Sequence, residues 1–144
     1  MKVDFWQLSK DPAEKVIAMI AARVLAEGER VLVVARDAER RSAVSKALWD
    51  ARPDAFLANG DANEPHAERQ PILLSDACKA TNDASHVIFA DGEWREPKGF
   101  ARVFLLFDDA TVEAARGVWR SLDGTEGLER SFFRQDGGKW VKVA

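Results

Sequence analysis

The stretch Arg30-Val31-Leu32-Val33-Val34-Ala35 decides the fold. After Arg30 it is continuously apolar, and it is rich in β-branched valine. Short apolar runs of this kind are typical of strands buried in parallel sheets. The stretch therefore predicts a buried parallel strand with an α/β fold around it.

The segments on either side of this strand carry helix signals. Before it, the run 11–14 supplies the capping residue Asp11, a proline suited to the first helical position and an acid three residues after the cap. Gly28 marks the end of that helix. Its apolar positions follow at helical spacing: Val16, Ile17, Ile20, Val24 and Leu25. After the strand, Asp37 is expected to cap a second helix that ends near Ala51.

Further apolar runs predict the remaining strands. They lie at 71–74, 87–90 and 102–107, and residues 2–8 are also predicted to form a strand, with Val3 and Phe5 on one side. The polar segment 59–70 is expected to be a loop, and Asp108 or Asp109 to cap a helix that ends near Leu122. Residues 128–143 are expected to form a terminal hairpin. Because strands and helices alternate, we expect a three-layer α/β/α fold with a mostly parallel central sheet, Rossmann-like without a phosphate loop.

Length and composition fit one soluble domain spanning residues 1–144. The apolar fraction of 47% and the charged fraction of 31% are those of a globular protein, and a net charge of −3 gives no general attraction to DNA or acidic membranes. The only cysteine, Cys78, excludes an internal disulfide. Residues 1–10 lack a signal-peptide core, and no apolar run approaches the ~20 residues that span a bilayer, so we expect a cytoplasmic protein.

Motifs for nucleotide chemistry are missing from the sequence. Neither G-x-G-x-x-G nor G-x-x-x-x-G-K-[ST] is present, and Ser9-Lys10-Asp11-Pro12 after the first strand offers no glycine cradle for phosphate. The two histidines, His66 and His86, are isolated. We therefore expect no catalytic residue, no metal and no cofactor. The alternative is a nucleotide-binding α/β enzyme with an unrecognised active site, because Asp108 and Asp109 follow a strand, where active-site acids often lie.

The helix expected after residues 102–107 carries the first candidate binding surface. Its apolar positions recur at spacings of three and four and are expected to face the core: Val112, Ala115, Trp119 and Leu122. Arg116 and Arg120 are four residues apart and project side by side. One interpretation is a solvated helix face on which Glu113 pairs with Arg116. The other is an anion-binding ridge beside Trp119, because a guanidinium can hold a carboxylate in a fork.

The segment 47–56 carries the second candidate surface. Trp49 lies at the end of a predicted helix, and Phe56 lies in the segment that follows. One interpretation is that both aromatic side chains seal the edge of the core. The other is that they form an apolar patch that anchors a partner protein, since tryptophan is enriched at binding hot spots.

Several blocks of sequence carry a family resemblance over nearly the whole chain. They are Val3-Asp4-Phe5-Trp6-Gln7-Leu8, Gly28-Glu29-Arg30-Val31-Leu32-Val33, Ala47-Leu48-Trp49-Asp50, Pro53-Asp54-Ala55-Phe56-Leu57, Arg102-Val103-Phe104-Leu105-Leu106-Phe107-Asp108, and Ala114-Ala115-Arg116 with Trp119. In their order and spacing they resemble the chi subunit family of bacterial DNA polymerase III, particularly its alphaproteobacterial forms. No single block is diagnostic; the resemblance rests on their order.

This resemblance implies a non-catalytic accessory subunit of the clamp-loader complex. Chi proteins pair with a small psi subunit, which tethers them to the clamp loader. The psi-facing aromatic positions of the family fall on Trp49 and Phe56. No cofactor is implied, and contact with nucleic acid is only indirect.

The resemblance also implies a second partner, the single-stranded-DNA-binding protein. Its acidic C-terminal tail ends in a phenylalanine, which chi proteins bury, and a free carboxylate. The tail-binding arginine of the family falls on Arg116, and the aromatic and basic positions that follow fall on Trp119 and Arg120. An apolar residue at the end of the preceding strand corresponds to Phe107.

Overall fold

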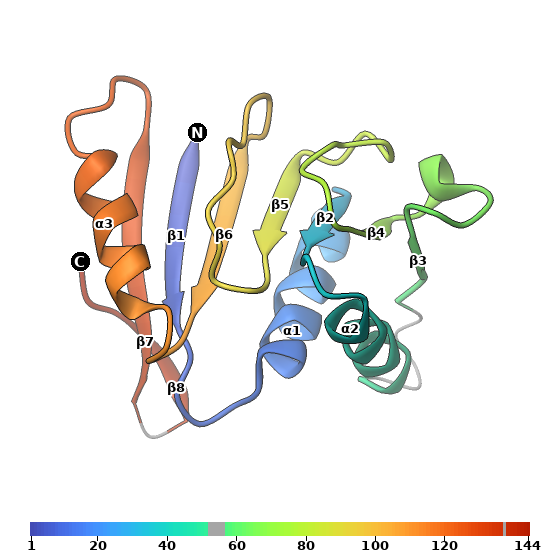
Figure 1. Ribbon diagram of the computed structural model, residues 1–144, viewed down its shortest axis with the longest axis horizontal. Helices are drawn as coiled ribbons and strands as arrows, with labels where there is room; N and C mark the ends of the chain where they lie inside the picture. The colour runs from blue at the N-terminus through green and yellow to red at the C-terminus, as the bar shows by residue number, and fades with distance from the viewer. Residues whose placement is uncertain (52–56, 137) are drawn as a thin grey trace.

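One eight-stranded sheet organises the computed structural model, which describes residues 1–51, 57–136 and 138–144. The order of these strands is β3-β4-β2-β5-β6-β1-β7-β8 (Figure 1), and only the pair β7–β8 is antiparallel. The strands are β1 (Lys2–Gln7), β2 (Val31–Val34), β3 (Asn59–Asp61), β4 (Ile72–Ser75), β5 (His86–Phe89), β6 (Arg102–Phe107), β7 (Glu129–Asp136) and β8 (Lys139–Lys142). The expectation of a mostly parallel sheet is confirmed.

Strand β2 lies inside this sheet, as its sequence predicts. It pairs in parallel with β4 on one side and β5 on the other. All of its residues are 0% exposed, because both faces of the sheet are covered. Alternate side chains serve different cores: Val31 and Val33 pack on one face, and Leu32 and Val34 on the other.

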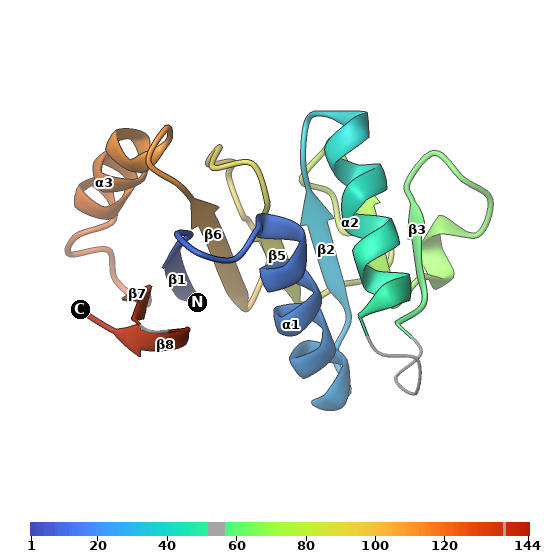
Figure 2. The same ribbon diagram turned by 90° about the horizontal axis from the view of Figure 1, so that it is seen from below.

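The helices divide between the two faces of the sheet. Helices α1 (Ala13–Ala26) and α2 (Ala38–Asp50) bury their apolar residues in one core, whereas α3 (Val112–Ser121) packs on the opposite face (Figure 2). On the α3 face, segments between strands complete the cover with Ala67, Ala84, Trp94 and Phe100. The arrangement is the expected three-layer α/β/α fold.

Of the three predicted N-cap residues, one caps its helix in the structure and two do not. The Asp37 side chain accepts a hydrogen bond from the backbone N–H of Glu39 at 3.0 Å and caps α2, as predicted. The expectation for Asp11 is wrong: α1 begins after Pro12, and the Asp11 carboxylate instead accepts a hydrogen bond from Gln135 Nε2 at 2.7 Å. The N-cap residue of α3 is Thr111, so neither Asp108 nor Asp109 caps it.

Asp108 acts in the turn before α3. Its carboxylate accepts hydrogen bonds from the backbone N–H groups of Ala110 at 3.0 Å and Thr111 at 3.2 Å. An aspartate commonly folds its own turn by bonding the backbone two residues on. Asp108 therefore shapes the link from β6 to α3 and positions the helix without capping it.

Strand β3 lies within the segment 59–70, for which the polar sequence predicts a loop. That expectation is wrong at Asn59–Asp61, which pairs in parallel with β4. The polar strand is held by side-chain bonds: Asn59 Oδ1 accepts a hydrogen bond from Ser45 Oγ at 2.6 Å, and Asn59 Nδ2 donates to the Leu57 carbonyl at 3.0 Å. No local apolar pattern predicts a short polar strand such as β3.

The predicted terminal hairpin is confirmed and extends the sheet beyond β1. Strand β7 runs parallel to β1, with Phe132 beside Phe5 and Phe133 beside Trp6. Phe132 belongs to the core beneath α3, whereas Phe133 packs on the α1 side. This register brings the end of the chain under the helix that carries the first candidate surface.

Candidate functional site

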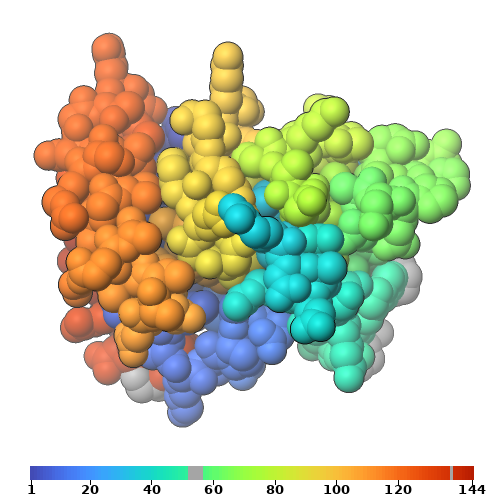
Figure 3. Space-filling view, viewed as in Figure 1, coloured from blue at the N-terminus to red at the C-terminus, as the bar shows by residue number. Residues whose placement is uncertain are grey.

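Helix α3 lies at the surface of its face, next to the segment that links β5 to β6 (Figure 3). It rests on the sheet through Ala115, which is fully buried, while the partly buried apolar residues pack around it: Val112, Val118, Trp119 and Leu122. The stripe expected from periodicity is therefore confirmed, with Val118 added. The exposed residues of α3 are Glu113, Ala114, Arg116, Arg120 and Ser121.

Trp119 is the centre of an aromatic cluster at the end of α3. Its ring lies edge-on to Phe5 at 5.1 Å and to Phe132 at 6.0 Å between centroids. Phe107 lies deeper, 1% exposed, and contacts Phe132 with a centroid distance of 5.5 Å. Trp119 and Phe132 are thus the partly exposed members of this cluster, and Phe107 packs against Phe132 in the core.

Arg116 and Arg120 are both exposed on α3. Arg116 Nη1 pairs with Glu113 Oε1 at 2.8 Å, with side chains 59% and 79% exposed. An ion pair this open to solvent contributes about 0–1 kcal/mol at most, so it gives way readily to a stronger anion. Arg120 makes no ion pair or side-chain hydrogen bond in the part of the chain that the structure describes. Helix α3 therefore carries two exposed arginines and the partly buried Trp119.

Arg130, on β7, contacts the candidate site and was not expected there from the sequence. Its guanidinium lies 4.2 Å from the centroid of the Trp119 ring. Nη1 donates a hydrogen bond to the Trp119 carbonyl, and Nη2 pairs with Asp123 Oδ1 at 2.8 Å. Arg130 and Phe132 are two residues apart and therefore share one face of the strand. This spacing is visible in the local sequence. The contact itself needs β7 to lie beside β1, which no local pattern shows.

The second candidate surface lies on the other face of the sheet, at the end of α2. Trp49 is 46% exposed there, whereas Phe56 lies outside the described residues. A groove of about 570 Å³ runs between α1 and α2. It is lined by small and apolar side chains with charged residues among them: Glu14, Lys15, Ala18, Met19, Ala22, Arg23, Ala26, Ala47, Asp50, Ala51 and Leu57.

The crevice where doubly wound folds usually bind ligands is acidic in this protein. Such ligands lie at the carboxyl ends of adjacent strands whose following helices cover opposite faces. Here those strands are β1 and β6, and a crevice of about 510 Å³ opens beside their ends. Its charged residues are Asp11, Glu14, Asp37, Glu39, Asp108 and the single cation Arg40. Carboxylates therefore stand where a phosphate would need positive charge.

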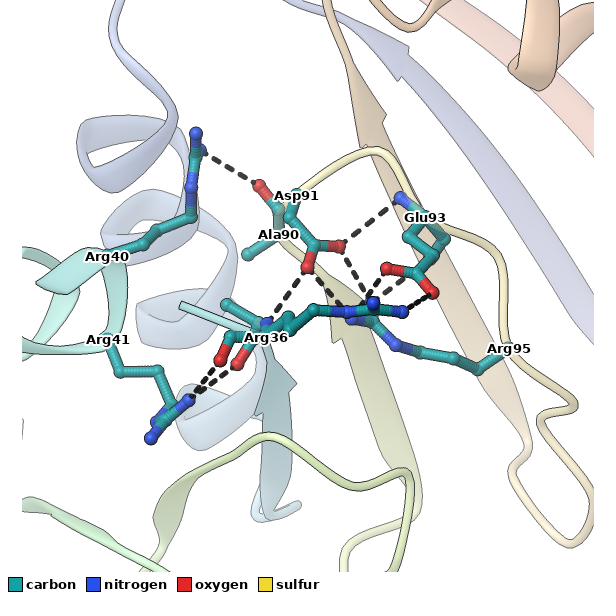
Figure 4. Close-up of polar contacts among 8 residues, drawn as sticks. Arg36, Arg40, Arg41, Ala90, Asp91, Glu93 and Arg95 are labelled. Atoms are coloured by element: carbon teal, nitrogen blue, oxygen red, sulfur yellow. Dashed lines mark hydrogen bonds and ion pairs between the residues drawn. The ribbon is translucent and has the colours of Figure 1, made fainter. Parts of the chain in front are cut away.

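Arginines near the carboxyl ends of β2 and β5 are bound to carboxylates and backbone carbonyls of this chain (Figure 4). Arg95 holds Asp91 in a bidentate pair at 2.7 and 2.8 Å, and Arg36 pairs with Glu93. Arg41 donates hydrogen bonds to the backbone carbonyls of Ala35 at 2.8 Å and Arg36 at 3.0 Å. These groups fasten segments of this chain to one another.

The remaining reactive side chains sit in ordinary surroundings. Burial, assisted by the Arg102 guanidinium, lowers the pKa of His86. Burial also raises the pKa of the Cys78 thiol, which disfavours the reactive thiolate. Among the described residues, no three His, Cys, Asp or Glu side chains are grouped so as to hold a metal ion. None of the helices in these residues is long and apolar enough to cross a membrane.

The sheet order, the three layers and the two candidate surfaces define an α/β protein of the mostly parallel, doubly wound class. The family described as DNA polymerase III chi subunit, HolC, matches residues 1–128 of the sequence. The chain belongs to this family, and the resemblance noted above is confirmed. No curated protein sequence matches the chain. Membership identifies a DNA polymerase III subunit, and the match ends directly before β7.

Proposed function

We propose that this protein is a non-catalytic accessory subunit of the clamp-loader complex that binds the acidic C-terminal tail of the single-stranded-DNA-binding protein through α3. The observation that carries the proposal is the pair Arg116 and Arg120, exposed on the helix that also carries the partly buried Trp119. A psi-type subunit is the second partner in this proposal, and its site is the surface around Trp49.

The chemistry of the α3 surface suits a tail with acids and a terminal phenylalanine. Charge-assisted hydrogen bonds from guanidinium to carboxylate are short and strong, and arginine can make two of them in parallel. The phenylalanine side chain would bury its apolar surface against Trp119 and the aromatic residues that pack on it. A tail of a few residues bound in this way would have a dissociation constant of about 1 μM, near −8 kcal/mol.

A nucleotide-binding enzyme is the less well supported alternative. The crevice at the ends of β1 and β6 is lined by five carboxylates, which repel phosphate. The arginines nearest to it are held by Asp91, Glu93 and backbone carbonyls. Positive charge is instead offered on α3, on the opposite face from α1 and α2.

The proposal predicts that Arg116→Ala weakens binding of a tail peptide by about 10- to 100-fold, because a charge-assisted contact contributes about 1.5–3 kcal/mol. Arg116→Lys should recover part of the affinity, since an ammonium cannot form the bidentate fork. Calorimetric titration with the tail peptide measures both, and affinity should also fall as salt rises.

Two controls sharpen this experiment. Arg69→Ala removes an exposed arginine near β4, remote from α3 in the sheet, and should leave the affinity unchanged. A peptide without its final phenylalanine should not bind. Equal affinities for the wild type and Arg116→Ala, with circular dichroism showing both folded, would remove Arg116 from the site and leave an ordinary solvated arginine.

A further inference from the structure

Arg130 lies on β7, which begins directly after the residues that the family match covers. Its side chain makes three contacts around the end of α3. It covers the Trp119 ring, bonds the backbone at the end of α3 and pairs with Asp123 beyond that end. Its side chain is 23% exposed, so most of it is committed to these contacts. A residue placed in this way acts on the site by fixing the residues around it.

We propose that Arg130 is a positioning residue for tail binding, holding the Trp119 ring and the last turn of α3 in the arrangement that the tail recognises. This inference rests on the proposed function of α3. It adds to that function a residue of the terminal hairpin, which would thereby become part of the binding site.

The contacts of the Trp119 ring support the inference that Arg130 holds this ring in place. The edge-on packing of Phe5 and Phe132 and the guanidinium at 4.2 Å hold the indole from several directions. A cation over an indole contributes about 0.5–2 kcal/mol, depending on how far it is desolvated. With Trp119 already ordered, the tail would lose less affinity to the ordering of side chains on binding.

The contacts at the end of α3 support the inference that Arg130 holds the last turn of this helix. The last carbonyl groups of a helix have no partner within it, and the Trp119 carbonyl lies in the last turn of α3. Arg130 Nη1 donates to this carbonyl and brings a positive charge to the negative end of the helix dipole. The same turn carries Arg120, so the contact steadies both the indole and a guanidinium of the proposed site.

Arg130→Ala removes a positive charge as well as the contacts that hold Trp119, and a control variant separates these two effects. The Arg130 charge is offset by Asp123 at 2.8 Å, and Arg134 offers a matched control on the same strand. Arg134 is exposed, and its side chain makes no ion pair or hydrogen bond within the described part of the chain. Removing Arg134 changes the net charge by the same amount while leaving Trp119 undisturbed.

The test is calorimetric binding of the tail peptide to the full chain and its variants. Arg130→Ala should weaken binding about 3- to 10-fold, and Arg130→Lys should recover part of this, since an ammonium can stand over the ring but cannot form both other contacts. Arg134→Ala should bind within about 2-fold of the wild type. The indole N–H signal of Trp119, assigned by its loss in Trp119→Leu, should shift in Arg130→Ala.

A double-mutant cycle decides whether Arg130 acts through Trp119. In the Trp119→Leu background, Arg130→Ala should cause little further loss. An equal loss in both backgrounds, or unchanged affinity in Arg130→Ala, would overturn the inference. If Arg130→Ala fails to fold, Arg130→Lys and Asp123→Asn must weaken binding, or the inference is wrong. A wild-type protein that does not bind the tail overturns the proposed function itself, whereas binding with an unaffected Arg130→Ala overturns only this inference.

Discussion

Asp91 is a single residue that joins the segment after β2 to the segment after β5. Its carboxylate receives both Arg95 contacts and hydrogen bonds from the backbone N–H groups of Arg36 at 2.9 Å and Glu93 at 3.2 Å. Burial by itself would raise the pKa of Asp91, but these hydrogen bonds and the Arg95 charge outweigh it and lower that pKa. The ionised carboxylate therefore stabilises the fold where β2 and β5 end.

We expect Asp91→Asn to reduce the free energy of unfolding by about 1–3 kcal/mol at pH 7, because Arg95 loses its charged partner in a largely buried pair. Urea unfolding measures the difference, with Asp76→Asn as an exposed control. A lowered carboxyl pKa contributes stability above the unfolded value of about 3.9 and loses it as pH falls through the folded value. The gap between wild type and variant should therefore close on acidification, and a gap independent of pH would contradict this account.

At the scale of elements, α2 carries two separable features at its ends. Its start is fixed by the Asp37 cap, and its buried residues, Val44 and Leu48, bind it to the core. Its last turn carries the exposed Trp49, and tryptophan is enriched at binding hot spots. The element thus combines a structural inner face with a proposed surface for a partner.

We expect Trp49→Ala to weaken co-purification with a co-expressed psi-type subunit by about 30-fold or more, since a hot-spot tryptophan contributes about 2 kcal/mol or more. Binding of the tail peptide to α3 should stay unchanged, because the two surfaces lie on opposite faces of the sheet. Lys46→Ala, at an exposed position of the same helix, is the matched control. Loss of both activities together would indicate general unfolding, and loss of neither would exclude Trp49 from the partner surface.

At the scale of the whole molecule, charge is distributed unevenly between the crevice at the sheet edge and helix α3. The ligand crevice at the ends of β1 and β6 is acidic, whereas α3 presents arginines away from it. Fold class alone does not decide function, so this distribution carries the argument.

A thermal-shift experiment tests the molecule as a whole. A tail peptide at about 100 times its dissociation constant should stabilise the fold by about 2.7 kcal/mol and raise the melting temperature by about 5–10 °C. ATP or GTP with Mg²⁺ should cause no shift, because the crevice carboxylates disfavour phosphate. A nucleotide-dependent shift that disappears in Asp108→Asn would instead support an enzyme.

Much of this protein could be inferred from local sequence. The valine-rich apolar run 31–34 indicated a buried strand, because β-branched residues favour strands and a strand covered on both faces is apolar throughout. The spacing of Arg116 and Arg120 placed both on one side of a helix. Only the tertiary structure decided which distant segments meet: Asp11 with Gln135, Asn59 with β4, and Arg130 with Trp119. Periodicity records which face of an element is buried, whereas parallel pairing joins residues across long connections and leaves no local pattern.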